Sequence, residues 1–139
     1  MSRLIISKLE LENFKSYSGK KTIGPLHASF SAIVGPNGSG KSNLIESLIF
    51  VFGKKAKDMR LKKLSELIHS SKEGGTQNPY AQVTVFFEEG DSRFQMARRV
   101  DRNSNSTYYL DGSVIRYSEI CQRLREKGID LDHNRFLIL

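Results

Sequence analysis

The sequence has one cysteine, no tryptophan and only three prolines among its 139 residues. The single Cys121 excludes an internal disulfide and makes a reducing compartment the default expectation. No apolar run approaches the roughly 18 residues that a membrane helix needs, so no membrane-spanning segment is expected. The first residues mix apolar and polar side chains without a small-residue cleavage site, so a secretory signal is not expected either.

Acidic residues are also fewer than basic ones. The chain has 15 Asp and Glu against 22 Lys and Arg, which gives a net charge of +7. Such a surplus favours polyanions as partners. Hydrophobic residues make up 38% of the chain, enough for one core, and the length predicts a single domain. These counts indicate a folded, basic domain and exclude a disordered tail.

The first third of the chain predicts an antiparallel hairpin followed by a strand and a helix. Residues 4–14 are expected to form a strand with Ile5, Ser7, Leu9 and Leu11 on one face. Residues 21–23 can return as its hairpin partner after the turn residues 17–20. The short apolar run 30–34 ends at Gly35. Over 42–52, apolar residues recur at three- and four-residue steps, which predicts a helix buried on most sides and ended by Gly53.

The rest of the chain predicts mainly strands joined by short turns. A short amphipathic helix is expected over 61–68, and strands over 81–87, 93–100 and 107–110. Asp111-Gly112 then predicts a tight hairpin to residues 114–115. A final helix is expected to begin with Ser118 as N-cap and Glu119 in its first turn, and to run to Lys127. Its apolar face would carry Ile120, Cys121 and Leu124, while only one of the adjacent Tyr108 and Tyr109 would face the core.

Residues 35–42 match the P-loop pattern, between an apolar run and a predicted helix. Glycines let backbone N–H groups approach phosphates closely, and the positive end of the following helix faces the same anion. Lys41 would reach the β- and γ-phosphates, and the Ser42 hydroxyl would ligate Mg²⁺. The alternative is a glycine-rich turn with an incidental lysine. The expected nucleotide-binding residues are Gly35, Pro36, Asn37, Gly38, Ser39, Gly40, Lys41 and Ser42.

A P-loop ATPase also needs an acidic residue at the end of a second buried strand. Glu88 and Glu89 follow an apolar run, but Gly90-Asp91 comes directly after them and indicates a hairpin. We therefore expect both glutamates at the solvated end of an antiparallel strand. Asp101 follows a strand made less suitable for burial by Arg98 and Arg99, and Asp111 precedes a turn glycine. The sequence thus predicts nucleotide binding without a catalytic acid, and the apolar 136–139 resemble a buried strand cut at its end.

Several segments resemble the N-terminal head segment of the structural maintenance of chromosomes (SMC) ATPases. They are Phe14-Lys15-Ser16-Tyr17, the P-loop extended to Asn43, Phe50-Val51-Phe52-Gly53, Met59-Arg60 and residues 64–69. Within the family, residues 3–6 and 128–139 resemble the condensin subunit 4 type. The resemblance covers essentially the whole chain and adds Asn43 to the expected nucleotide-binding residues. Only about 71–107 is generic.

The resemblance implies an α/β P-loop NTPase fold. Residues 1–139 would be the N-terminal lobe of an ABC-type ATPase head, with an antiparallel-rich sheet plus the P-loop strand and helix. The coiled coil, the hinge and the C-terminal lobe with the catalytic acid would lie outside the chain. ATP and Mg²⁺ would be the cofactors, and two heads would sandwich two ATP molecules. ATP-driven engagement and hydrolysis would then act in chromosome condensation and segregation.

The same resemblance implies the partners and the place of action. The expected partners are the protein's own C-terminal head lobe, a second SMC head of the condensin subunit 2 type, a kleisin and other non-SMC condensin subunits, and DNA. No membrane partner is expected. The implied localisation is the nucleus and chromosomes, with a cytoplasmic pool.

Further basic residues are candidates for contacts with nucleotide or DNA. The resemblance suggests that Lys15 lies near the phosphates or DNA, although it can equally be a solvated turn lysine. Arg60 matches the family arginine that lies near the nucleotide and links DNA to ATP turnover. Its alternative is a solvated basic loop, because residues 54–63 hold six positive charges against Asp58. The candidates for sequence-independent DNA contacts are Lys54, Lys55, Lys57, Lys62 and Lys63.

Two alternative functions and one possible metal site remain beside this interpretation. A self-sufficient small P-loop enzyme, such as a kinase, would turn over nucleotide without a partner. The head of a DNA-repair SMC relative would share the P-loop but would not be expected to carry residues 128–139. Asp130, Asp132 and His133 have no zinc-site spacing, so a polar turn is expected there and no metal cluster.

Overall fold

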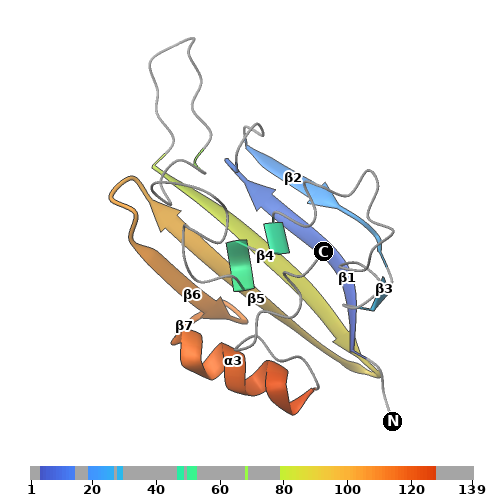
Figure 1. Cartoon of the computed structure of the whole chain (residues 1–139). Helices are drawn as coiled ribbons and strands as arrows, with labels where there is room; N and C mark the ends of the chain where they lie inside the picture. The colour runs from blue at the N-terminus through green and yellow to red at the C-terminus, as the bar shows by residue number, and fades with distance from the viewer. Residues whose placement is uncertain are drawn as a thin grey trace, which may run out of the picture.

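The computed structural model of the chain describes residues 4–14, 19–26, 28–29, 47–48, 50–52, 68 and 79–127. One seven-stranded sheet organises this part of the chain, in the order β2-β1-β4-β5-β6-β7, with β3 also pairing to β1 (Figure 1). All the strand pairs within it are antiparallel. The elements are β1 Leu4–Glu12, β2 Lys20–Ile23, β3 Ala28–Ser29, β4 Tyr80–Glu89, β5 Ser92–Asp101, β6 Ser106–Leu110, β7 Ser113–Ile115 and α3 Tyr117–Glu126.

The predicted hairpins are confirmed. β1 returns as β2, where the Asn13 N–H donates to the Gly19 carbonyl at 2.9 Å and the Gly19 N–H donates to Asn13 Oδ1 at 2.8 Å. At the β6–β7 turn both central residues have positive φ, +50° at Asp111 and +85° at Gly112. A two-residue turn of this kind matches the twist of the flanking strands, and glycine adopts it without strain. The turn chemistry in the sequence therefore sets the sheet order at this end.

The prediction of which β1 side chains point into the core is wrong for the first half of the strand. Leu9 and Leu11 point into the core as expected, but Ile6 is buried where Ile5 was expected. The reason is a β-bulge, because Ile6 pairs with Phe87 while Lys8 pairs with the adjacent Phe86. An extra residue in one strand shifts the alternation by one position. Ser7 is that residue, and its hydroxyl donates to the Phe86 carbonyl at 3.2 Å.

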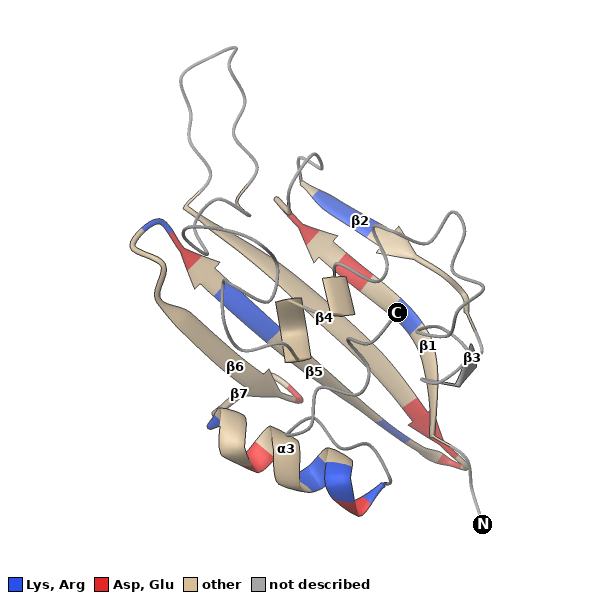
Figure 2. Cartoon of the chain, viewed as in Figure 1, with Lys and Arg blue, Asp and Glu red and all other residues tan. Residues whose placement is uncertain are grey.

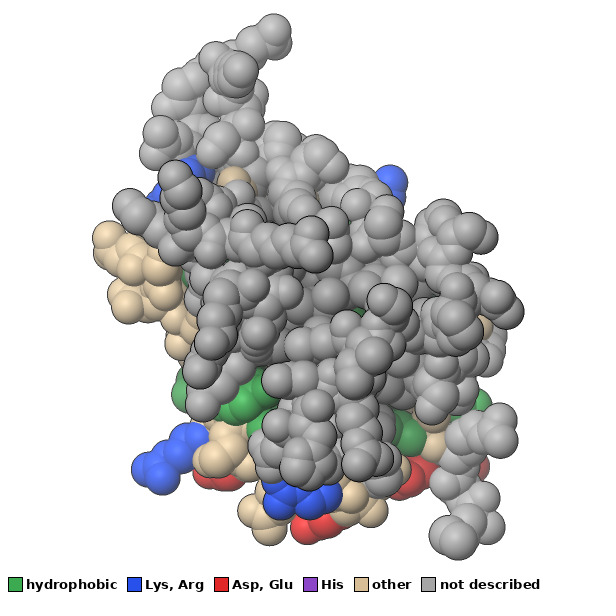
Figure 3. Space-filling model, viewed as in Figure 1, with side chains coloured by type: hydrophobic (Ala, Val, Ile, Leu, Met, Phe, Trp, Pro, Cys, Tyr) green, Lys and Arg blue, Asp and Glu red, His purple; other side chains and the backbone are tan. Residues whose placement is uncertain are grey.

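The core lies between one face of the sheet and the helices packed on it, which are α3 and the helical residues 47–48 and 50–52 (Figure 1). Figure 3 shows apolar side chains just above α3, with charged side chains of the helix below them. Phe14 and Ile68 are both buried and form an isolated antiparallel bridge. The helix predicted over 61–68 is thus wrong at Ile68, and 61–67 lie outside the described residues. The buried sheet residues of this core are Leu4, Ile6, Leu9, Leu11, Ala81, Val83, Val85, Phe87, Met96 and Val100.

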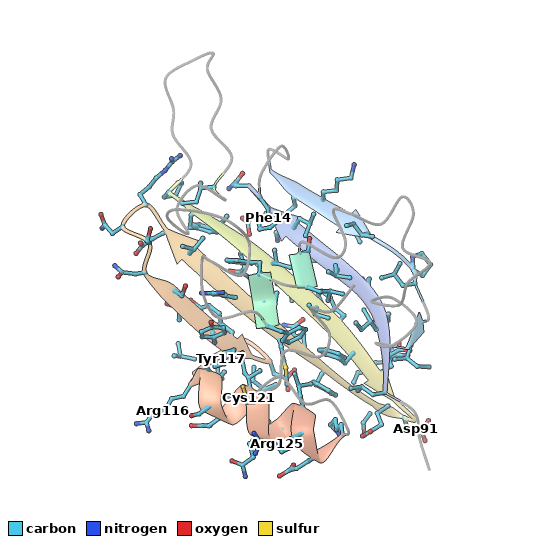
Figure 4. All side chains as sticks on the ribbon, viewed as in Figure 1. Phe14, Asp91, Arg116, Tyr117, Cys121 and Arg125 are labelled. Atoms are coloured by element: carbon cyan, nitrogen blue, oxygen red, sulfur yellow. The ribbon has the colours of Figure 1, made fainter. Side chains whose placement is uncertain are left out.

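The helix α3 packs on the core through Ile120, Cys121 and Leu124, as predicted. It begins at Tyr117 after an extended Arg116, and no side chain caps its N-terminus. Ser118 is therefore not the N-cap. Figure 4 shows Tyr117 and Cys121 directed toward the sheet and Arg116 and Arg125 directed away from it. At the start of this helix, Tyr117 packs its ring on Tyr108 and donates its hydroxyl to the Phe52 carbonyl.

The opposite face of the sheet carries polar and charged side chains. The Arg99 guanidinium stacks on the Tyr80 ring at 3.9 Å and lies 5.8 Å from the Tyr109 ring centroid. The Tyr80 hydroxyl donates to Glu12 at 2.8 Å, which raises the pKa of Tyr80. Figure 2 shows how the basic residues of β5 interrupt a largely uncharged strand. Tyr109 on this face and Tyr108 against the core confirm the expected alternation. In the part of the chain that the structure describes, no helix is long and apolar enough to span a membrane.

Candidate nucleotide site

The P-loop residues Gly35–Asn43 lie outside the described residues, but both flanks of this segment are placed. Before it, β3 pairs Ala28 and Ser29 with Ile6 and Ile5 of β1. After it, residues 47–48 and 50–52 are helical, in agreement with the helix predicted over 42–52. The structure therefore places residues near the end that the sequence predicts, at Gly53, for the helix that begins at the P-loop.

This end of the helix is buried on several sides, as its sequence predicted. Leu48, Phe50, Val51 and Phe52 are all fully buried. The Phe50 ring lies 5.4 Å from the ring of Phe14, which continues from β1. The Phe52 ring lies 6.2 Å from that of Phe87 on β4. Aromatic contacts at such spacing add specific geometry to apolar burial, so the helix has a defined position on the sheet.

Two side chains from other elements bind carbonyls at this helix end. Arg98 of β5 donates from Nη1 to the Phe50 carbonyl at 2.6 Å, and Tyr117 of α3 donates its hydroxyl to the Phe52 carbonyl at 2.6 Å. The last carbonyls of a helix have no partner within the helix, and a cation there is favourable with the helix dipole. In the helix that the sequence predicts over 42–52, the positive end of the dipole would face the P-loop sequence, where an anion would bind.

The environment of Arg98 is almost closed to solvent, because its side chain is 2% exposed. Burial lowers the pKa of the guanidinium, although an arginine remains protonated in proteins. Ser106 Oγ accepts from Nε at 3.2 Å and from Nη2 at 2.9 Å, and the Phe50 and Tyr108 rings lie on its faces at 4.9 and 5.0 Å. The expectation that Arg98 makes β5 unsuitable for burial is wrong, because Arg98 itself is buried. The alternation of strand residues contains the information that could have predicted this burial, because it places Arg98 on the same face of β5 as Met96 and Val100.

The acidic residues at the end of β4 are where the sequence placed them. Glu88 and Glu89 are the last residues of the strand and are partly exposed, and the turn Gly90-Asp91 follows them. Glu88 lies 3.6 Å from the Arg93 guanidinium, and Lys127 donates to Glu89 at 2.6 Å. Both carboxylates belong to an antiparallel strand end and pair with surface cations. This arrangement supports their interpretation as solvated rather than catalytic groups.

Asp111 holds a turn, as expected, and Asp101 holds one as well. Asp101 Oδ1 accepts from the N–H groups of Asn103 at 2.9 Å and Asn105 at 3.0 Å. Asp111 Oδ1 accepts from the N–H of Gln95 at 2.9 Å. Hydrogen bonds from the backbone stabilise an ionised carboxylate in place. Neither group sits at the end of a parallel strand, where an acid for Mg²⁺ and water would be needed.

The hydrogen bonds that Asp101 accepts should make the stability of the fold depend on pH. The Asn105 N–H, helped by Asn103 and the Asn105 side chain, lowers the pKa of Asp101 from its ordinary 3.8. A lowered folded-state pKa stabilises the fold above pH 3.8, and this contribution is lost as the pH falls through the lower folded-state value. An NMR titration of the Asp101 carboxyl carbon should therefore give a midpoint below 3.8. A midpoint at or above 3.8, with Asp101→Asn unfolding in acid like the unmodified chain, would contradict this.

A matched tyrosine pair tests the packing beneath Arg98. The Tyr108 ring lies 5.1 Å from that of Tyr117, and its buried hydroxyl has no hydrogen-bond partner among the described residues. Tyr108→Phe should leave the free energy of unfolding unchanged or raise it by about 1 kcal/mol, because it removes an unsatisfied buried group. Tyr117→Phe removes a donor to the Phe52 carbonyl and should cost about 1–2 kcal/mol. Urea unfolding of both variants measures the contrast, and equal losses would contradict it.

The remaining sequence candidates lie outside the described residues. They include Lys15 and Arg60, and the possible metal cluster of Asp130, Asp132 and His133. Among the residues that are described, no group of three metal-ligating side chains occurs. The other candidates beyond the described residues are Lys54, Lys55, Lys57, Lys62 and Lys63.

Residues 5–133 match the model of the RecF/RecN/SMC N-terminal domain. The chain belongs to this family. It is 48% identical to structural maintenance of chromosomes protein 4 of Saccharomyces cerevisiae and 46% identical to that of Homo sapiens. Both matches cover 99% of this chain but only 11% and 12% of the relatives. The chain thus spans about a tenth of these relatives' length, and it corresponds to the N-terminal head segment of an SMC protein.

Solved SMC heads share this fold. The Smc head domain of Pyrococcus furiosus with an extended coiled coil, bound to the C-terminal domain of ScpA, has a TM-score of 0.74. It is 33% identical, over 93% of this chain and 34% of that one. A second solved structure comes from work on ATP-driven dimerization and DNA-stimulated activation of SMC ATPases. It has a TM-score of 0.72 to this chain and is 33% identical to it. That match covers 97% of this chain and 92% of the other.

These matches confirm the predicted fold class, an α/β ABC-type head segment with an antiparallel-rich sheet. RecF bound to ATP is a more distant neighbour, with a TM-score of 0.57 and 18% identity, and at that identity it supports the fold alone. The relatives do not favour the alternative of a self-sufficient small P-loop enzyme.

Proposed function

We propose that this chain is the ATP-binding N-terminal lobe of a condensin-type SMC head. The observation that carries the proposal is a P-loop sequence, Gly35–Ser42, at the start of a predicted helix whose far end is buried and bound at two carbonyls. The 45–48% identity to structural maintenance of chromosomes protein 4 over 99% of the chain supports the condensin type. In this role the lobe binds nucleotide and supplies no catalytic acid.

The residue types of the P-loop fit ATP with Mg²⁺. The helix dipole and the glycine-rich backbone suit a chain of phosphates, Lys41 suits the β- and γ-phosphates, and the Ser42 hydroxyl is a hard oxygen ligand that suits Mg²⁺. Mg²⁺ held by Ser42 would supply positive charge that neutralises the phosphates. Asn43 extends the nucleotide-binding segment by one residue, while Lys15 and Arg60 would sense nucleotide or DNA.

The proposed partners complete the active site. The protein's own C-terminal head lobe supplies the acid for Mg²⁺ and water, and a second SMC head of the condensin subunit 2 type closes over the nucleotide. A kleisin, other non-SMC condensin subunits and DNA complete the assembly. The basic residues between Lys54 and Lys63 would contact the DNA backbone. The complex would act in the nucleus on chromosomes, with a cytoplasmic pool, during chromosome condensation and segregation.

ATP-driven association of heads tests this proposal. The chain is assembled with a C-terminal head lobe, mixed with the partner head, and examined by analytical ultracentrifugation with and without ATP and Mg²⁺. We expect the heads to associate when both are present and to separate when EDTA removes Mg²⁺. Association that is independent of nucleotide, or an absence of association at saturating ATP, would contradict the proposal.

A further inference from the structure

We propose that Arg98 is a positioning residue for the nucleotide site, acting through the far end of the P-loop helix. The inference rests on the proposed function, because it assumes that the chain binds ATP. Arg98 lies on β5, far in the sequence from the P-loop, and contacts neither nucleotide nor Mg²⁺ in this account. Its role is to hold the helix on the sheet so that the phosphate-binding end has one position.

The contacts of Arg98 connect Phe50 of the helix to the sheet. Nη1 binds the Phe50 carbonyl at 2.6 Å while Nε and Nη2 bind Ser106 Oγ on β6, so one rigid guanidinium joins the helix to two strands. The guanidinium is planar and its five N–H donors have fixed directions, which distinguishes it from a lysine ammonium. With the Phe50 and Tyr108 rings on its faces, the side chain has little freedom to follow a shift of the helix.

A second tether acts on the same helical turn from another element. The Tyr117 hydroxyl of α3 donates to the Phe52 carbonyl at 2.6 Å, and the Tyr117 ring packs on Tyr108. Burial raises the pKa of Tyr117, so this hydroxyl stays protonated and continues to donate throughout the physiological range. The helix end is thus held from β5 and from α3 at two carbonyls that are two residues apart.

Mechanical coupling follows from the stiffness of a helix. Phe50 lies eight positions after Ser42, so in the helix that the sequence predicts over 42–52 about two turns would separate the tether from the phosphate-binding end. Such a helix would transmit a tilt or a shift at Phe50 to its other end. Phosphate binding requires donors within a few tenths of an ångström of their places, so a poorly seated helix loses affinity even when it remains folded.

The test separates positioning from simple loss of stability. The chain, assembled with a C-terminal head lobe, is titrated with a fluorescent ATP analogue and Mg²⁺ well below its melting temperature. Arg98→Met keeps the length and apolar stem of the side chain but removes the charge and donors. We expect its Kd for the analogue to rise about 2- to 30-fold, the range of indirect coupling effects. Arg98→Lys keeps the charge without the fork and should recover only part of the affinity.

Leu124→Ala is the matched control. Leu124 is fully buried on α3, and its loss leaves a cavity in the same core without removing a donor to the helix carbonyls. It should lower the melting temperature at least as much as Arg98→Met while leaving the Kd within about twofold. If Leu124→Ala weakens the nucleotide as much as Arg98→Met does, or if Arg98→Met binds like the unmodified chain, the positioning role is excluded.

Tyr117 and Lys41 distinguish the remaining outcomes. If Arg98→Met does not fold, Tyr117→Phe removes one donor from the second tether and should still weaken the nucleotide, whereas an unchanged Kd there would overturn the inference. Failure of the proposed function has a different signature. In that case the unmodified chain and Lys41→Ala have the same affinity for the ATP analogue, whatever residue stands at position 98.

Discussion

We expect Lys41→Ala to weaken ATP binding by about 10- to 150-fold. A charge-assisted hydrogen bond to phosphate is worth about 1.5–3 kcal/mol, which corresponds to that range of dissociation constants. Lys41 follows three glycines of the P-loop pattern and precedes Ser42, the position from which a lysine reaches the β- and γ-phosphates. Its replacement removes a cation from the phosphates without changing the backbone donors of the loop, so weak residual binding is expected to remain.

Lys20→Ala is the control for the loss of one positive charge. Lys20 is exposed on the edge strand β2 and pairs in register with Glu12 of β1. Its replacement lowers the net charge of the chain by the same amount but should leave the ATP affinity within about twofold, because solvent screens an exposed charge. Isothermal titration with Mg-ATP measures both variants. Equal affinities of Lys41→Ala and Lys20→Ala would mean that Lys41 does not contact the phosphates.

We expect Phe87→Ala to lower the free energy of unfolding by about 3–5 kcal/mol, the usual cost of emptying a buried aromatic site. The Phe87 side chain is 1% exposed, and its ring stacks on Phe94 at 4.9 Å and contacts Phe52 at 6.2 Å. It thus joins β4, β5 and the helix that follows the P-loop in one cluster. Loss of that cluster removes apolar burial from both the sheet and the helix.

Phe86→Ala is the matched variant on the opposite face of the same strand. The Phe86 ring is partly exposed, and the Lys8 ammonium lies 4.5 Å from its centroid. Removing it costs a surface contact and an exposed cation–π interaction, so about 1 kcal/mol is expected. Urea unfolding monitored by circular dichroism gives both values. If the two variants lose equal stability, the register assigned to β4 beside the Ser7 bulge is wrong.

Local chemistry allowed the sequence to predict much of the sheet. Asp111-Gly112 predicted its hairpin because few residue pairs adopt positive φ at two successive positions. Gly90-Asp91 placed Glu88 and Glu89 at a strand end for the same kind of reason. The buried helix residues around Phe50 were visible as a periodic apolar pattern. In each case the information lies within a few neighbouring residues.

The errors have causes that are distant in the sequence. Ile6 replaces Ile5 in the core because of a bulge, which depends on how β1 pairs with β4 some eighty residues later. Arg98 is buried because Phe50 and Ser106 provide acceptors for it, and neither is its sequence neighbour. Ser118 does not cap α3 because Tyr117 begins the helix and reaches the Phe52 carbonyl. Tertiary contacts decide such positions, and no local pattern records them.

ATP hydrolysis by the chain alone, compared with the chain mixed with its C-terminal head lobe and the partner head, decides whether the chain needs these partners for catalysis. We expect no turnover by the chain alone, because Glu88, Glu89, Asp101 and Asp111 occupy turns and strand ends. In the mixture we expect turnover that Lys41→Ala abolishes. Lys41-dependent hydrolysis by the chain alone would instead indicate a complete small enzyme with its own catalytic acid, and the half-head function would be wrong.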